Sequence, residues 1–409
     1  MVASNRQGER SKRRYLDGWF GPAALAVLVF AGPLKSSPAL TWLPVDLTLA
    51  AGSIVALAAI ASRLNRGHTV SAVAIPLVLL ALFLLGIFGS SLDGYSLSKI
   101  VALYTLTFLA MLAPFYVLRT APQRRVFITA LVAIAIFVGI LTIAAPSQDI
   151  AYAGVRLLEG SNTISTAQML SAGVVVCLVL AASLKIHPSS RLILAVLGGV
   201  LAFSALGTGS RGPFFAIGLA LFGVIVMSPM FSKLRGRAIA TAFVVTSVAA
   251  FFAVRGGGGG AARIFGFISG QEDNSVRVRQ YLLGQAVENI GASPAGIGWG
   301  NFIQIAGLWR YVEGDRLYPH NVVVEIFLEA GWLAGFAVLV YLVWTLVRAA
   351  KSSATPMSAV IFGLTIFSVF NAMVSGDIND NRLMWVLLSC AWIVNAQESK
   401  PVNDYGVIP

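Results

Sequence analysis

The chain has 409 residues, of which 57% are hydrophobic and only 11% are charged, and its mean hydropathy is +0.82. A soluble chain carries roughly 25% charged residues, so this chain has too few charged groups to cover a water-exposed globule. The formal net charge of +12 falls in short clusters between apolar runs. This distribution is typical of membrane topology signals, not of a groove that follows nucleic-acid phosphates.

Apolar runs of the length needed to cross a bilayer recur along the whole chain. A helix needs ~20 apolar residues to span the hydrocarbon core. Twelve runs come close to that length, near 19–34, 43–62, 69–88, 97–118, 125–145, 166–184, 191–207, 212–230, 237–254, 322–347, 356–375 and 383–396. We therefore predict an all-α polytopic membrane protein with about twelve transmembrane helices. The first run follows a basic segment without a small-residue cleavage site, and we interpret it as a retained helix.

The orientation of these helices follows from the lysines and arginines in the loops. With the N-terminus in the cytoplasm, 18 of the 29 basic residues fall on the inner side. Five fall in short outer loops, namely Lys35, Lys99, Arg156, Arg211 and Arg382. The remaining 6 lie in the long segment 255–321, which has no influence on orientation because long loops translocate regardless of charge. We expect both termini to be cytoplasmic.

Three regions follow from this topology: helices one to nine in 1–254, a large periplasmic loop in 255–321, and the last three helices with a cytoplasmic tail in 322–409. The loop begins with a glycine run at 256–260, which predicts a flexible exit from the membrane. A helix is expected over 275–290, with four apolar residues on one face, namely Val278, Leu282, Ala286 and Ile290. The glycines that follow, in 293–300, resemble a dinucleotide-binding fingerprint only superficially, because no strand precedes them.

Only three histidines occur in the sequence. Of these, His320 lies directly before the apolar run 322–347, at the end that is expected on the outer side. It belongs to the sequence Tyr318-Pro-His-Asn321. An imidazole at this place can act as a general base or acid near neutral pH, or it can be an interfacial loop residue without chemistry. His68 and His187 lie in basic inner loops and are interpreted as solvated.

Arginines on the outer side are the candidates for binding an anion. Arg211 stands just before Pro213, which suits the first turn of a helix, where free N–H groups favour an anion. Arg277 and Arg279 begin the predicted loop helix, and residues two positions apart cannot share one face. Arginine matches phosphate oxygens in bidentate fashion. The alternatives are a snorkelling Arg211 and a solvated pair in the loop.

Together these residues favour a transferase that works on a polyprenyl-pyrophosphate donor. The arginines suit the pyrophosphate, and the histidine can take a proton from an attacking hydroxyl group. An activated donor of this kind carries its own leaving group, so no ATP site and no other cofactor is expected. No acidic cluster of the type that holds Mg²⁺ or Mn²⁺ is evident in the sequence, which favours metal-independent chemistry.

The same residues resemble the bacterial O-antigen ligases and their polymerase relatives. His320-Asn321, nine further residues and Gly331 are similar to the family signature, although Ala334 occupies its last position and Gly335 follows. The turn around Arg211, the helix with Arg277 leading to Pro294-Ala-Gly-Ile-Gly298, and the one large loop before the tenth helix are also similar to the family pattern. These motifs span roughly 205–335, and the layout covers the whole chain.

The resemblance implies a role for each matched residue. His320 would be the catalytic base for an acceptor hydroxyl, with Asn321 beside it, and Arg211 and Arg277 would bind the donor pyrophosphate. Tyr281 stands where the family has an aromatic residue four positions after the arginine, so Arg277 is preferred over Arg279. Arg156, in an outer loop, is a further candidate for the donor site.

The implied reaction transfers O-antigen from undecaprenyl pyrophosphate to lipid A–core oligosaccharide, without a metal and with inversion, at the periplasmic face of the inner membrane. The expected partners are thus the lipid-linked glycan donor, the lipid A–core acceptor and membrane lipid, with no nucleic acid. Three alternatives stay open: an O-antigen polymerase, a protein O-oligosaccharyltransferase, and a lipid or solute transporter. A transporter would carry ionisable residues near the bilayer midplane, and the sequence shows almost none.

Overall fold

The computed structural model describes residues 18–66, 71–144, 158–232, 274–306 and 317–398. The expected ninth span at 237–254, the glycine run at 256–260 and Arg156 lie outside the described residues. Within those ranges the chain is helical and contains no strand.

The helices of the first half lie between Phe20 and Phe231. They are α2 (Phe20–Lys35), η1 (Pro38–Leu40), α3 (Leu47–Arg66), η2 (Ser71–Val73), α4 (Ala74–Phe83), α5 (Leu85–Phe88), α6 (Gly94–Ala102), η3 (Leu103–Thr107), α7 (Phe108–Leu112), α8 (Pro114–Val117), α9 (Ala121–Ala144), α10 (Thr163–Ala181), α11 (Pro188–Gly207), α12 (Arg211–Met227) and η5 (Pro229–Phe231). The helices of the second half are α15 (Asn274–Ile290), α16 (Phe302–Ile305), α17 (Val322–Glu329), α18 (Trp332–Lys351), α19 (Pro356–Val374) and α20 (Arg382–Glu398).

Seven stretches of helix are long and apolar enough to cross a membrane. They are Leu47–Leu64, Gly94–Val117, Ala121–Ile143, Thr163–Ala181, Pro188–Gly207, Trp332–Lys351 and Pro356–Val374. Four shorter apolar helices accompany them, at Phe20–Lys35, Ala74–Phe88, Arg211–Met227 and Arg382–Val394. Each coincides with one of the expected runs. For the described residues this confirms an all-helical architecture with several candidate membrane spans, and the total of about twelve stays a prediction.

The outward faces of these helices carry large apolar side chains. Leu57 on α3, Phe203 on α11 and Phe336 on α18 are more than half exposed. Large exposed apolar side chains in such number, over so many helices, are unfavourable in water, and they are what a helix presents to lipid tails. The structure thus agrees with the composition: this is a membrane protein.

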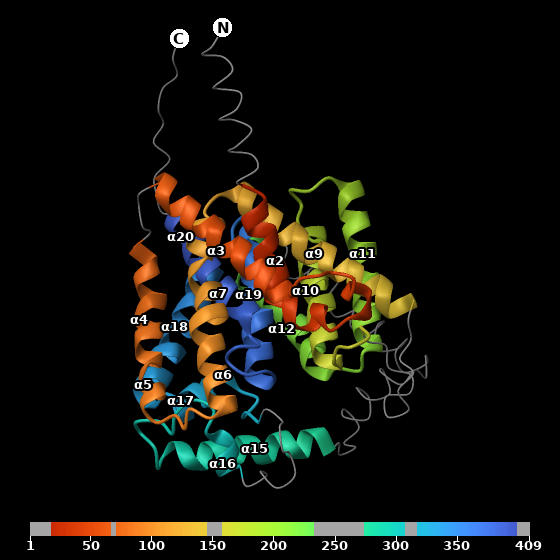
Figure 1. The fold of residues 1–409 in the computed structure, drawn as a ribbon. Helices are drawn as coiled ribbons and strands as arrows, with labels where there is room; N and C mark the ends of the chain where they lie inside the picture. Colours follow the sequence, from red (N-terminus) through yellow and green to blue (C-terminus); the bar gives the residue numbers. More distant parts are fainter. Residues whose placement is uncertain (1–17, 67–70, 145–157, 233–273, 307–316, 399–409) are drawn as a thin grey trace.

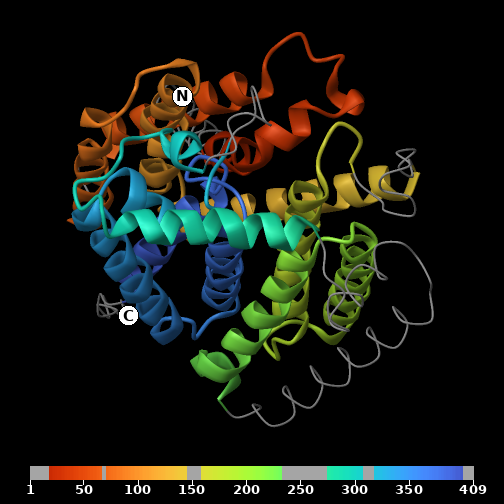
Figure 2. The ribbon, with the colours of Figure 1, turned by 90° about the horizontal axis from the view of Figure 1, so that it is seen from below.

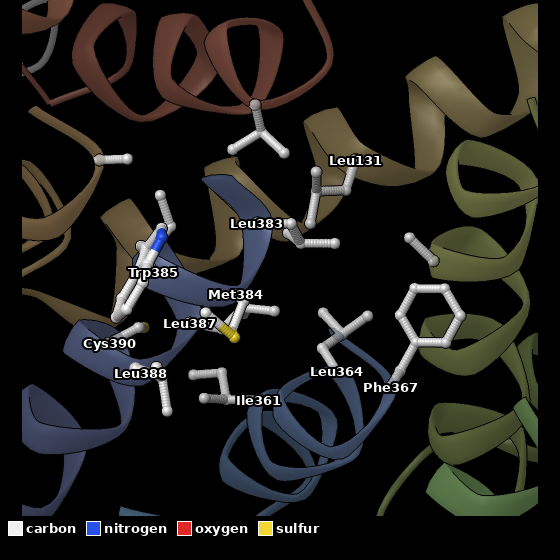
Figure 3. Close-up of a cluster of buried hydrophobic side chains, with 14 of the residues drawn as sticks. Leu131, Ile361, Leu364, Phe367, Leu383, Met384, Trp385, Leu387, Leu388 and Cys390 are labelled. Carbon is white, nitrogen blue, oxygen red and sulfur yellow. The ribbon is translucent and has the colours of Figure 1, made fainter. Parts of the chain in front are cut away.

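Helix α10 is the central helix of one half of the bundle. Most of its side chains are buried, because α9, α11, α12 and α19 all pack against it. A second packed region joins α9, α19 and α20 through Leu131, Leu364 and Leu383 (Figure 3). Helix α19 takes part in both regions and therefore links them. This packing on both sides fixes the position of the C-terminal end of α19.

Helix α15 runs across one end of the bundle, with the short α16 beside it (Figures 1 and 2). The predicted helix over 275–290 is confirmed, and it packs on α17 through Leu282 and Ala286. Val278, which was expected on the same face of the helix, is 49% exposed, so the buried stretch of that face does not extend to its first residue. The buried face is narrower than four-residue spacing suggested, because α15 touches only the end of the bundle.

The apolar run at 322–347 is not one helix, as expected, but two. It breaks at Gly331, which has φ +89°, so that α17 ends at Glu329 and α18 begins at Trp332. A residue in this left-handed region cannot continue a right-handed helix. The break lets the short helix α17 take a direction of its own at the end of the bundle.

Candidate functional site

His320 and Asn321 form the turn that starts α17. His320 has φ +59°, an uncommon value for a residue with a side chain. Asn321 caps the helix, since its Oδ1 accepts a hydrogen bond from the backbone N–H of Val324 at 3.1 Å. Asparagine is among the residues preferred at this position. The structure thus gives Asn321 a positioning role, in which it fixes the backbone that carries the imidazole.

The imidazole of His320 is packed against an aromatic ring and retains a free ring nitrogen. Its ring centroid lies 4.5 Å from that of Tyr318, and its buried Nδ1 has no hydrogen-bond partner. Burial, followed by the positive charge of Arg279, lowers the pKa of His320 from 6.5 to about 4. The ring is therefore neutral at pH 7, with one nitrogen lone pair available to accept a proton.

Three elements meet at Val374, the last residue of α19, and bring the arginine-bearing segments together. Arg279 on α15 donates from Nη1 to the Val374 carbonyl oxygen at 3.3 Å. Gly212, the second residue of α12, is packed so closely that a Cβ there would lie 3.2 Å from Val374 Cγ2. Arg211 begins α12 at the same place, as the helix-start prediction required.

The two arginines of α15 differ in their surroundings. Arg279 is half-buried and its charge acts on His320, whereas Arg277 is exposed. The sequence pattern preferred Arg277 for the donor pyrophosphate, and that role stays a prediction. In this conformation the charge of Arg279 contributes to the lowered pKa of His320.

The segment that leads from α15 towards α17 contacts the end of α17 at three glycines. In Gly296, Gly298 and Gly331, φ lies between +89° and +92°, and a Cβ at Gly296 would lie 2.6 Å from the Glu329 carbonyl oxygen. The segment pairs with the end of α17 through Ile297 N–H to Leu328 O at 2.9 Å. The glycines therefore permit a close approach between two backbones, and they hold α17 by its C-terminal end.

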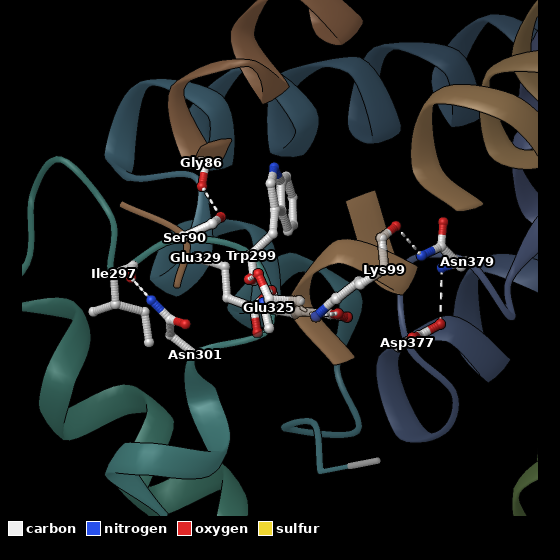
Figure 4. Close-up of polar contacts among 12 residues, drawn as sticks. Gly86, Ser90, Lys99, Ile297, Trp299, Asn301, Glu325, Glu329, Asp377 and Asn379 are labelled. Carbon is white, nitrogen blue, oxygen red and sulfur yellow. Dashed lines mark hydrogen bonds and ion pairs between the residues drawn. The ribbon is translucent and has the colours of Figure 1, made fainter. Parts of the chain in front are cut away.

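A buried ion cluster lies directly behind α17. Lys99 Nζ is 2.6 Å from Glu325 Oε1 and 2.5 Å from Glu329 Oε2, and all three side chains are at most 1% exposed (Figure 4). Glu329 Oε2 also accepts from the Gly300 backbone N–H at 3.1 Å. Buried charges of this kind persist only when they are paired, so the cluster fastens α17 to α6 and to the glycine segment.

The ion cluster continues into the turn before α20. The Asn379 side chain donates to the Lys99 carbonyl oxygen at 3.0 Å and accepts from the Thr107 hydroxyl at 2.7 Å. Asp377 Oδ1 in turn accepts from the Asn379 backbone N–H at 2.8 Å. One continuous polar network therefore runs from α6 to the turn between α19 and α20, on the side where His320 lies.

Sequence reasoning missed this network. It placed Lys99 in a short outer loop, whereas the structure buries it inside α6. The available signal was the pair Glu325 and Glu329, which are one helical turn apart and hence on one face. A carboxylate pair on an apolar helix requires a cation opposite, but the sequence does not say which one. Among the described residues no group of three His, Cys, Asp or Glu could hold a metal ion.

The fold and this arrangement define a polytopic helical membrane protein with a histidine- and arginine-bearing site at one end of its bundle. Comparison with known families is more specific. The family model described as O-antigen ligase matches residues 199–339, so this part of the chain is similar to the O-antigen ligase family. The matched region contains Arg211, both arginines of α15, His320 and α17. Members of this family are glycosyltransferase-like enzymes of the ligase and polymerase type. No curated protein matches the chain significantly.

Proposed function

We propose that the chain is an O-antigen ligase, which transfers a glycan from undecaprenyl pyrophosphate to a sugar hydroxyl of lipid A–core oligosaccharide. The end of the bundle that carries His320 would face the periplasm, with both termini in the cytoplasm. The observation that carries the proposal is the neutral, half-buried His320, with an unpartnered Nδ1, next to the charge of Arg279. A base and a cation side by side suit an attack by a neutral hydroxyl on an anionic donor.

The chemistry follows from these two groups. His320 accepts the proton of the acceptor hydroxyl as its oxygen attacks the anomeric carbon of the donor sugar. The bond from that carbon to the pyrophosphate oxygen breaks, and undecaprenyl pyrophosphate leaves with the bonding electrons. Arg211, with Arg277 or Arg279, would bind the leaving pyrophosphate. Attack opposite the leaving group inverts the anomeric configuration, and no metal ion takes part.

A pKa of about 4 describes His320 without a substrate, and the donor would change it. Arg279 contributes to the low pKa, and a pyrophosphate between the two residues would neutralise that positive charge. A nearby anion also stabilises an imidazolium directly. Binding of the donor would thus make His320 a stronger base at the moment when it is needed.

The test is transfer by the purified full-length chain in detergent, without ATP and in the presence of EDTA. It would be supplied with undecaprenyl-pyrophosphate glycan and lipid A–core, and the products would be resolved on a gel. Glycan on lipid A–core is the expected product. A ladder of longer lipid-linked glycans would identify a polymerase instead, and activity that disappears in EDTA and returns with a divalent ion would contradict the metal-free mechanism.

A further inference from the structure

A cavity of ≈ 360 Å³ opens between α2, α10, α19 and the turn before α20. It involves the C-terminal ends of α2 and α19 and the N-terminal end of α10, and Tyr318 contributes to its wall. Because the Tyr318 ring also contacts His320, the cavity lies directly beside the candidate site. Its size falls within the range of ~300–1,000 Å³ that is usual for small-molecule sites.

The wall of this cavity combines neutral hydrogen-bonding side chains with apolar ones. The hydrogen-bonding groups include Asn162 and Gln168 around the start of α10 and Asn371 on α19, and the apolar ones include Phe30 and Phe367. Its two charged side chains, Asp380 and Arg382, have opposite signs, so their charges offset each other. A pyrophosphate would require an excess of cations here, which the lining lacks. A wall that mixes apolar and neutral hydrogen-bonding side chains suits a sugar, whose ring faces are apolar and whose edges carry hydroxyl groups.

Asn371 supplies an independent indication that the cavity receives a ligand. Its side chain is 2% exposed, and its Nδ2 donates to the Phe367 carbonyl oxygen at 2.8 Å within α19. Its Oδ1 has no partner. A buried acceptor without a donor is unfavourable, and here it belongs to a residue that lines an open cavity. A hydroxyl group of a ligand in the cavity would satisfy it.

We propose that this cavity binds a sugar segment of one of the two substrates, with hydroxyl groups donating to Asn371 Oδ1 and bonding to Gln168 on the facing helix. The proposal rests on the glycosyl-transfer function above, and it adds a sugar-binding subsite that contains neither His320 nor the arginines of α12 and α15. The sugar can belong to the acceptor core or to the donor glycan, which share this chemistry.

Binding to the purified full-length chain, measured by isothermal titration, tests the subsite apart from catalysis. The probes are lipid-free core oligosaccharide, lipid-free O-antigen glycan, and inorganic pyrophosphate. At least one oligosaccharide should bind, and the one that binds identifies the substrate. In Asn371→Leu and Gln168→Leu its affinity should fall roughly 3- to 10-fold, the usual effect of one lost neutral hydrogen bond. Pyrophosphate should not displace it.

The control is Thr365→Val on the same helix, because the Thr365 hydroxyl bonds to the Ile361 carbonyl oxygen at 2.7 Å and does not line the cavity. Its affinity for the sugar should equal that of the wild type. If neither oligosaccharide binds, or if both cavity variants bind as tightly as the wild type, the proposal is wrong. Sugar binding by a chain that transfers no glycan would instead contradict only the proposed function. Gln168→Leu preserves the test if Asn371→Leu does not fold.

Discussion

Lys99 Nζ lies 2.6 Å from Glu325 Oε1, between two helices that are far apart in the sequence. Glu329 shares the same ammonium group from one turn further along α17. Since α17 begins at the cap formed by Asn321, directly after His320, the ion cluster determines where the histidine stands. The cluster holds two carboxyl groups and one cation, and all three are buried. Loss of any one of these groups would therefore leave a buried charge without its partner.

We expect Lys99→Met to destabilise the protein strongly. The substitution leaves two buried carboxyl groups without a cation, and breaking a buried pair in this way costs ~3–5 kcal/mol. The midpoint of unfolding in detergent should therefore fall. The triple variant Lys99→Met, Glu325→Gln, Glu329→Gln should recover much of the loss, because it removes the stranded charges as well.

The pair formed by Lys35 and Asp46 is the matched control. Its atoms are 2.9 Å apart, but its side chains are 46% and 37% exposed, and surface pairs contribute only ~0–1 kcal/mol. Lys35→Met should shift the unfolding midpoint little. Equal effects of the two lysine substitutions would show that the buried cluster does not stabilise the fold.

The sequence was informative about the fold wherever one segment carried the whole signal. The length of each apolar run predicted a helix, and the run that begins at 322 correctly located the start of α17. Lys99 and Glu329 are 230 positions apart, and no local pattern pairs them. The break at Gly331 was missed for the same reason, since the apolar run continues through it and only the backbone contact with Pro294 and Ala295 demands the turn.

Substituting His320 by alanine should reduce glycan transfer by ~10²–10⁴-fold, the usual contribution of a general base. His187→Ala is the control, because His187 is exposed and its Nδ1 contacts only the Ser189 hydroxyl, at 2.8 Å. Initial rates with saturating donor would be compared. Near-normal transfer by His320→Ala would eliminate the general-base role.

Arg211→Ala should weaken the engagement of the donor more than that of the acceptor. Removing one cation from a pyrophosphate site costs a charge-assisted hydrogen bond, ~1.5–3 kcal/mol, or roughly 10- to 150-fold in donor KM. Arg277→Ala is expected to act in the same direction if the family pattern assigns it correctly. Titrations of donor at fixed acceptor measure both effects, and a rise confined to acceptor KM would contradict the assignment.

Arg279 should control the acid limit of activity. Protonation of His320 removes the base, so transfer should fall as the pH drops through its pKa, which is about 4 in the free protein. Arg279→Gln removes a positive charge and should raise that pKa, moving the acid limb of kcat/KM upward. Burial is the larger cause of the low pKa of His320 and is unchanged by this substitution, so the acid limb of the kcat/KM profile should stay below pH 6.5. Arg277→Gln, at an exposed position, should leave it in place; equal shifts would show that Arg279 has no special relation to the histidine.

Gly331 should tolerate no side chain, whereas Gly284 should accept one. At Gly331, φ is +89° and a Cβ would lie 2.7 Å from the Ala295 carbonyl carbon. Alanine there would cost ~1–3 kcal/mol in backbone strain and push α17 away from the glycine segment, so both the unfolding midpoint and transfer should fall. At Gly284 on α15 a Cβ meets nothing within 4 Å, and alanine should stabilise that helix by ~0.5–1 kcal/mol. If Gly331→Ala had the same unfolding midpoint as Gly284→Ala and kept full activity, the close contact between the glycine segment and α17 would not position His320.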